Sequence, residues 1–176
     1  RKHAARLGVD PARIAAGGGS AGGHIAACTG TIRHYDESDE DAKVSSVPNA
    51  MVLFNPAVAL APYEDQLPFA KKRLAEIEGR VGVQPRSLSP VHHVRKGVPP
   101  TLILHGEADK TVAFKTLEWF AAAMKKAGNP VRLIGYKGQP HGFFNYGRSG
   151  NKHFIATVRA MDQFLAELGW LKGKPT

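Results

Sequence analysis

Ser20 lies in the segment Gly-Gly-Ser-Ala-Gly, residues 18–22, which fits the G-x-S-x-G pattern of a nucleophile elbow. An apolar run precedes this segment and a helical pattern follows it, and a sharp strand-to-helix turn strains the serine backbone. We expect Gly18 and Gly22 to be required because side chains there would collide with the neighbouring strand and helix. Ser20 would then present its hydroxyl at a helix N-terminus, where free N–H groups favour a developing anion. The pattern predicts a nucleophilic serine.

Phosphate loops and a plain tight turn are the alternatives for this segment. A Walker loop ends in Gly-Lys-Ser or Gly-Lys-Thr, but the residue directly before Ser20 is a glycine. A dinucleotide-binding loop needs an acidic residue at the end of the next strand, but the apolar run at residues 49–54 is followed by Asn55 and Pro56. The segment therefore fits an elbow better than a phosphate loop, with the tight turn as its structural alternative.

An acid and a base follow the serine along the chain. A serine hydroxyl is a weak nucleophile unless a base takes its proton, and a histidine base needs an acid to orient it. Asp109 follows a later apolar run, and His141 lies in the loop after the next one. Loops at the carboxyl ends of parallel strands meet at one edge of a sheet. The order Ser20, Asp109, His141 is that of the α/β-hydrolase triad, and Glu107 is the alternative acid.

The other histidines and the single cysteine are assigned no chemistry. His24 lies one turn into the helix after the serine and is expected to form structural hydrogen bonds. His92, His93 and His105 lack the spacing to a matched acid or thiol that a zinc site requires. Cys28 stands among apolar residues and is expected to be a small core residue rather than a nucleophile. We therefore predict no metal and no organic cofactor.

The apolar pattern alternates between strands and helices, which predicts an α/β fold with a parallel sheet, flanking helices and right-handed crossovers. Residues 1–8 have the pattern of a helix end. Strands are predicted at residues 13–16, 49–54, 101–105 and 131–136, and helices at residues 21–34, 68–77, 113–127 and 152–168.

Residues 57–97 form a long irregular segment that is rich in proline. A loop region of this length inside a compact domain is usually a functional lid or binding element. We therefore predict a lid or pocket insertion at residues 57–97 within one catalytic domain that covers residues 1–176. Asn55, at a strand end, is expected to line the pocket.

Composition and charge restrict the class of protein. Of the 176 residues, 43% are apolar and 22% are charged, as in a single globular domain. No apolar run reaches the ~18 residues that cross a bilayer, so no membrane-spanning segment is predicted. The net charge of +9 raises the question of nucleic acid, but the basic residues are scattered and form no stripe interleaved with aromatic residues. We predict no nucleic-acid partner and leave the compartment open.

Three segments resemble the α/β-hydrolase esterase/lipase group, and within it the small bacterial carboxylesterases and acetyl-xylan-type esterases. The segments read IAAGGGSAGGH at residues 14–24, PTLILHGEADKTV at residues 100–112 and HGFFNYG at residues 141–147. The resemblance implies a sheet of about eight strands, of which the strands predicted here correspond to strands 5 to 8. The chain is therefore expected to be the C-terminal half of that fold, with the N-terminal part missing.

The resemblance also bears on the oxyanion hole. In the family a glycine-rich loop upstream supplies one N–H donor, and no such loop is recognised in this chain. Only the backbone N–H of Ala21, directly after the nucleophile, is assigned as a donor. Loss of one such donor costs on the order of 10²- to 10³-fold in turnover, so the activity of this chain alone is left open.

These observations predict a serine hydrolase that cleaves short-chain carboxylic esters, including acetyl groups on carbohydrate, through an acyl-enzyme. Its expected partner is a small-molecule ester. One alternative is a serine peptidase domain of the prolyl-oligopeptidase kind, which resembles the same three motifs. Another is a catalytically silent fragment that serves as a structural or binding module. If the strand at residues 13–16 lies at an exposed sheet edge, we expect dimerisation or aggregation through that edge.

Overall fold

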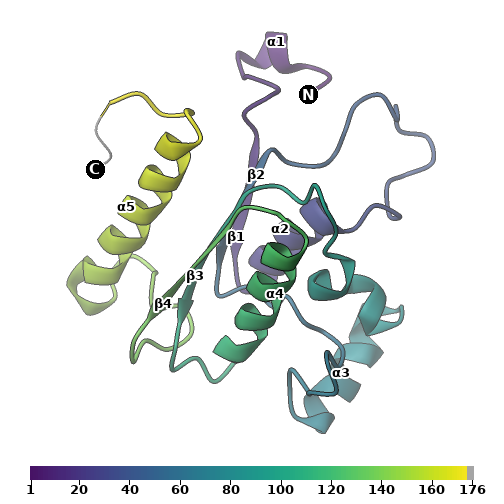
Figure 1. Cartoon of the computed structure of the whole chain (residues 1–176), viewed down its shortest axis with the longest axis vertical. Coiled ribbons are helices and arrows are strands. Elements are labelled where there is room, and N and C mark those ends of the chain that lie inside the picture. The colour runs from purple at the N-terminus through teal and green to yellow at the C-terminus, as the bar shows by residue number, and fades with distance from the viewer. Residues whose placement is uncertain (174–176) are drawn as a thin grey trace.

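The computed structural model describes residues 1–173 and contains one parallel four-stranded sheet (Figure 1). The strands are β1 (Ala15–Gly19), β2 (Ala50–Phe54), β3 (Thr101–Gly106) and β4 (Val131–Tyr136). They lie side by side in chain order, and each neighbouring pair is parallel. Parallel neighbours need long crossover connections, and the helical segments between the strands supply them.

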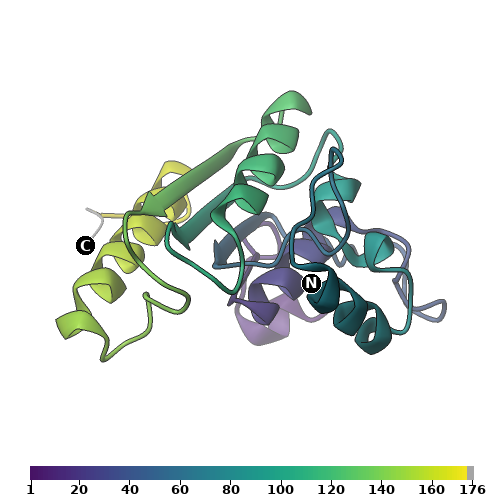
Figure 2. The same cartoon turned by 90° about the horizontal axis from the view of Figure 1, so that it is seen from below.

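Helices cover both faces of this sheet. They are α1 (Ala4–Leu7), α2 (Ala21–Thr31), α3 (Lys71–Val81), α4 (Phe114–Lys126) and α5 (Lys152–Glu167), with 3-10 turns η1 (Pro85–Leu88), η2 (Pro90–His93) and η3 (Ser149–Asn151). The α2 and α4 helices pack on one face and α5 packs on the other (Figure 1). The α3 helix lies at the end of the molecule far from α5 (Figure 2). None of the helices in residues 1–173 is long and apolar enough to cross a bilayer.

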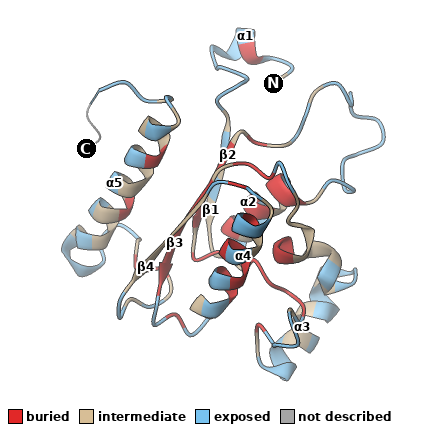
Figure 3. Ribbon diagram, viewed as in Figure 1, coloured by how far each residue is buried: buried red, intermediate tan, exposed pale blue. Residues whose placement is uncertain are grey.

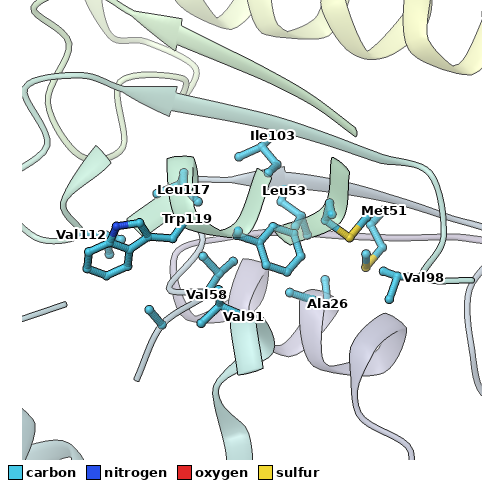
Figure 4. Packing of buried hydrophobic residues seen from close by; sticks show 14 residues of the cluster. Ala26, Met51, Leu53, Val58, Val91, Val98, Ile103, Val112, Leu117 and Trp119 are labelled. Atoms are coloured by element: carbon cyan, nitrogen blue, oxygen red, sulfur yellow. The ribbon is translucent and has the colours of Figure 1, made fainter. Parts of the chain in front are cut away.

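The central strands bury alternate residues against opposite layers. Met51, Leu53 and Ile103 pack with α2 and α4 in the larger core cluster (Figure 4). Their chain neighbours Val52 and Leu102 pack with α5 in a second cluster. Figure 3 shows these strands buried, whereas α3 has no buried residue. Because β2 and β3 are covered on both faces, their sequences are almost wholly apolar.

The predicted α/β fold is confirmed, but its first strand begins later than predicted. The apolar run at residues 13–16 indicates a strand there, whereas β1 extends through the glycines. Gly17 pairs with Val52 in the parallel register, and a Cβ on Gly17 would lie 3.0 Å from the carbonyl oxygen of Val52. Apolar periodicity carries no signal for glycine, which is why the pattern misplaces this strand.

Two helices also differ from their predicted bounds. The helix predicted at residues 21–34 ends at Thr31, because Ile32 adopts extended backbone with φ −99° and ψ 139°. The helix predicted at residues 68–77 is α3, which begins three residues later and continues to Val81. The predictions for β2, β3, β4, α4 and α5 agree with the structure to within one residue.

The β1 strand is an edge of the described sheet, because it pairs only with β2. Ala15, at its start, is exposed. This is the condition under which association through the edge is expected, and that association stays a prediction.

Candidate active site

Ser20 occupies the turn between β1 and α2 with strained backbone. Its φ is 55° and its ψ is −117°, a region that non-glycine residues rarely adopt. The Ser20 N–H donates a 2.8 Å hydrogen bond to the carbonyl oxygen of Phe54 at the end of β2. This bond ties the turn to the neighbouring strand, so the hydroxyl is presented at the carboxyl edge of the sheet.

The glycines around this turn differ in why they are needed. A Cβ on Gly18 would lie 2.6 Å from the carbonyl carbon of Gly22, so only glycine fits at residue 18. The same expectation for Gly22 is wrong, because a Cβ there would lie more than 4 Å from every described atom outside its chain neighbours and the backbone of its own helix. Gly23 was missed: its Cβ would lie 2.9 Å from the Gly18 carbonyl oxygen and 3.0 Å from the Pro56 side chain. The close contact between α2 and the strands thus requires Gly18 and Gly23.

The structure brings the predicted serine, histidine and acid into one hydrogen-bonded chain. Ser20 Oγ lies 2.9 Å from His141 Nε2, and His141 Nδ1 lies 2.7 Å from Asp109 Oδ2. With the ring proton on Nδ1, His141 donates to the carboxylate and accepts from the serine hydroxyl. The three residues follow the carboxyl ends of β1, β3 and β4, which lie at the same edge of the parallel sheet.

The Asp109 carboxylate is enclosed by donors. Its side chain is 0% exposed. Oδ1 accepts the backbone N–H groups of Thr111 at 2.8 Å and Val112 at 3.0 Å, while Oδ2 accepts from His141. Both oxygens of this buried carboxylate thus have hydrogen-bond donors in the protein. Asp109, not the alternative Glu107, therefore faces the histidine.

Asn55 does not line the pocket as predicted. Its side chain is fully buried, and both ends of the amide are used. Nδ2 donates to Asp109 Oδ2 at 2.9 Å, and Oδ1 accepts the N–H of Gly142 at 3.2 Å. The amide thus links the acid to the loop that carries the histidine. The sequence signal for this role is an asparagine directly after a strand. The Asn55 φ of 43° is a conformation that asparagine tolerates.

His105 contacts the same carboxylate from the other side. The ring is fully buried, with Nε2 at 3.0 Å from the carbonyl oxygen of Val112 and 3.3 Å from Asp109 Oδ2. Burial lowers the pKa of His105, although the Val112 carbonyl and Asp109 oppose that shift. The neutral ring with its proton on Nε2 fits these contacts, so His105 packs against the acid as a neutral donor.

His24, His92 and His93 have structural hydrogen bonds, and Cys28 lies beside His24. His24 Nε2 lies 2.7 Å from the carbonyl oxygen of Leu88, as expected of a hydrogen-bonding residue. Both His92 and His93 hydrogen-bond within the segment between β2 and β3. His92 contacts the Ser89 hydroxyl and the carbonyl oxygen of Pro62, and His93 contacts the carbonyl oxygen of Arg86. Cys28 is half-buried, and burial raises the pKa of its thiol to about 12. Within residues 1–173, no group of three or more histidine, cysteine or acidic side chains could hold a metal ion.

A cavity of about 270 Å³ opens beside the serine. Ser20, Ala21 and His24 are among its lining residues, and most of the lining is apolar. Ala21 is the first residue of α2, so its N–H has no partner within the helix. The segment between β2 and β3 supplies much of the wall, through residues Ala57, Leu60, Phe69, Arg73, Ile77, Arg80 and Val81.

Comparisons with known proteins agree with the resemblance seen in the sequence. The family model described as BD-FAE matches residues 1–124. The chain is 28% identical to "Probable carboxylic ester hydrolase LipM" of Mycobacterium tuberculosis over 96% of its own length and 40% of that protein. It is 27% identical to an acetylxylan esterase of Xylanibacter ruminicola, over 95% of its own length and 32% of that protein.

A solved structure is also similar. Esterase 2 of Thermogutta terrifontis, phosphonylated by sarin, superposes with a TM-score of 0.92 at 46% identity, covering 98% of this chain and 63% of that one. The chain therefore spans less than half of the two curated relatives and under two thirds of the solved one. The family match covers most of the chain, and the chain belongs to the BD-FAE family of α/β-hydrolase esterases.

Proposed function

We propose that the protein hydrolyses carboxylic esters through a covalent acyl-enzyme on Ser20. The observation that carries the proposal is the hydrogen-bonded chain from Ser20 Oγ through His141 to Asp109, with distances of 2.9 and 2.7 Å. A strained turn at the nucleophile and an enclosed carboxylate are the further features that such a reaction uses. The esterase relatives support the same reaction class.

In the first half of the reaction His141 Nε2 takes the proton of Ser20 as Oγ attacks the ester carbonyl carbon. Asp109 holds the imidazole in the tautomer with its proton on Nδ1 and stabilises the imidazolium that forms. The tetrahedral intermediate collapses when the C–O bond to the alcohol breaks. His141 then returns the proton to the leaving alcohol.

In the second half, water replaces the alcohol. His141 removes a proton from the water, the hydroxide adds to the acyl carbon, and Ser20 leaves as His141 gives the proton back. We assign the N–H of Ala21 to the oxyanion, because the first helical N–H is unpaired and the helix dipole favours negative charge there. Gly18 and Gly23 let the chain turn closely enough to present that donor.

Short acyl esters, including acetyl groups on carbohydrate, are the proposed substrates. A cavity of about 270 Å³ with a mostly apolar wall suits a small acyl or alcohol group. The Thermogutta esterase has been solved with propionate and with butyrate bound, and one relative is an acetylxylan esterase. We further propose that residues 57–97 act as the pocket element that sets specificity.

Hydrolysis of 4-nitrophenyl acetate by the 176-residue chain and by its Ser20→Ala variant tests this proposal. We expect turnover that the substitution abolishes, together with labelling of Ser20 by a fluorophosphonate probe in the unsubstituted chain. Equal rates in the two proteins would overturn the proposal. Labelling without turnover would favour the silent module, and cleavage of a proline-containing peptide in preference to the ester would favour the peptidase.

A further inference from the structure

The α3 wall of the cavity beside Ser20 carries two arginines on one helix face. Arg73 and Arg80 both line the cavity, and they stand seven residues, about two helical turns, apart. Ile77 and Val81 line it from the same face. Both arginines therefore border a mostly apolar lining, and charge–charge attraction is stronger near a protein surface than in open water.

No acidic side chain shares this lining. The cavity wall holds two arginines and no Asp or Glu. The α3 acid Glu78 lines a separate cavity, with Leu74 and Gln84, on another side of the helix. Asp109 lies below the serine with its side chain 0% exposed and its oxygens already bonded. The residues that line the described cavity thus include two cations and no acid.

Neither arginine is held in a buried ion pair. The side chain of Arg80 makes no hydrogen bond or ion pair with the other described residues, 1–173. Arg73 pairs with Glu76 through one nitrogen at 3.2 Å, with side chains 51% and 46% exposed. Exposed pairs of this kind contribute little and exchange readily with other anions. A planar guanidinium matches a carboxylate with two parallel hydrogen bonds.

We propose that Arg73 and Arg80 bind an ionised carboxylate of the substrate, so that the preferred esters carry a second acid group in their alcohol or acyl part. This inference rests on the proposed esterase function, because it concerns the cavity at Ser20. The inference adds a preference for charged substrates to the proposed preference for short acyl groups. The triad motifs carry no information on substrate charge. Arg73 and Arg80 are then specificity residues on the pocket segment.

Matched esters measure this preference. The pair 4-acetoxybenzoate and 4-acetoxybenzamide differs only in charge on the alcohol part, and monophenyl glutarate and phenyl pentanoate differ in charge at the acyl end. We compare kcat/KM for each in the wild type, the double variant R73Q/R80Q and the control K71Q/K72Q. The control removes the same charge from the same helix at two exposed lysines that do not line the cavity.

We expect R73Q/R80Q to lower kcat/KM for the charged member of at least one pair by about tenfold, with little change for the neutral member. The control should change neither, and added salt should narrow the difference in the wild type. Equal losses for charged and neutral esters, or no loss for either charged ester, would overturn the inference while leaving esterase activity intact.

An equilibrium measurement separates this inference from the proposed function. The amides 4-acetamidobenzoate and 4-acetamidobenzamide resemble the first ester pair, and titration calorimetry with the Ser20→Ala variant needs no turnover. We expect the charged amide to bind more tightly, and R73Q/R80Q to remove the difference. If the charged amide binds no better than the neutral one, and R73Q/R80Q also leaves the rate with monophenyl glutarate unchanged, the inference fails.

Discussion

Asn55 donates a 2.9 Å hydrogen bond to Oδ2 of Asp109, the same oxygen that lies 2.7 Å from His141. The other end of the amide accepts the N–H of Gly142, the residue after the histidine. One buried side chain therefore holds the acid and the histidine loop in register. In the proposed reaction Asn55 is a positioning residue, because it acts on Ser20 only through Asp109 and His141.

Asn55→Ala is expected to lower kcat on 4-nitrophenyl acetate by about tenfold or more with a smaller change in KM, because the acid loses a donor and the loop loses an anchor. Asn55→Gly separates this effect from backbone strain, since glycine adopts the φ of 43° freely. Both variants should lose kcat, while thermal unfolding should show Asn55→Ala to be the less stable. An unchanged kcat in both variants would rule out the positioning role.

Asp109→Asn is expected to lower kcat on the order of 10³- to 10⁴-fold, because a neutral amide neither selects the productive tautomer of His141 nor stabilises its cation. Glu107→Gln is the matched control, since Glu107 is the nearby acid that does not bond the histidine. Steady-state rates with 4-nitrophenyl acetate check both. A larger loss in Glu107→Gln than in Asp109→Asn would show that Glu107, and not Asp109, is the acid of the triad.

Alanine at the two motif glycines should have opposite effects on stability. Gly18→Ala puts a Cβ 2.6 Å from backbone carbon, so the turn must distort and we expect a loss of several kcal/mol or failure to fold. Gly22→Ala puts a Cβ where no atom of another segment lies within 4 Å, and in a helix alanine is favoured over glycine by about 0.5–1 kcal/mol. Urea unfolding of the two variants decides this. Comparable destabilisation by both would contradict the packing described for α2.

The free energy of unfolding should fall below about pH 6.5 in part because of His105. Burial lowers the pKa of His105 in the folded chain below the ordinary value of 6.5, so only the unfolded chain takes up the proton just below that pH. The contribution is complete above pH 6.5 and decreases toward the folded-state pKa. Urea unfolding at pH 7.5 and 5.5 should show a smaller difference in His105→Gln than in the wild type. The exposed histidine variant His3→Gln is the control, and an equal pH dependence in all three proteins would refute the assignment.

Association through the β1 edge is the remaining expectation. The strand pairs on one side only, and an unpaired edge of a sheet favours pairing with another chain. Size-exclusion chromatography with light scattering should detect species larger than the 18.9 kDa chain, and Ala15→Lys should reduce them. A single monomeric species in the unsubstituted chain would contradict this expectation.

Local patterns predicted most of the fold. Runs of apolar residues placed β2, β3 and β4 to within one residue, because a strand covered on both faces must be apolar throughout. The helical period of the apolar residues predicted α4 and α5, because a helix that packs on a sheet carries its apolar residues along one side. The β1 strand was misplaced because its glycines contribute geometry rather than hydrophobicity.

The sequence by itself determined which three residues could form a triad, because Ser20, Asp109 and His141 each stand after a predicted strand and parallel strands bring such loops to one edge. Only the tertiary structure decided which neighbours support them. Asn55 lies 54 residues from Asp109 in the chain and contacts it through a buried hydrogen bond. Arg80 lines the cavity because α3 packs beside it. Contacts of this kind depend on how whole helices and strands pack. A local pattern of residue types does not encode which distant residues of the chain become neighbours in space.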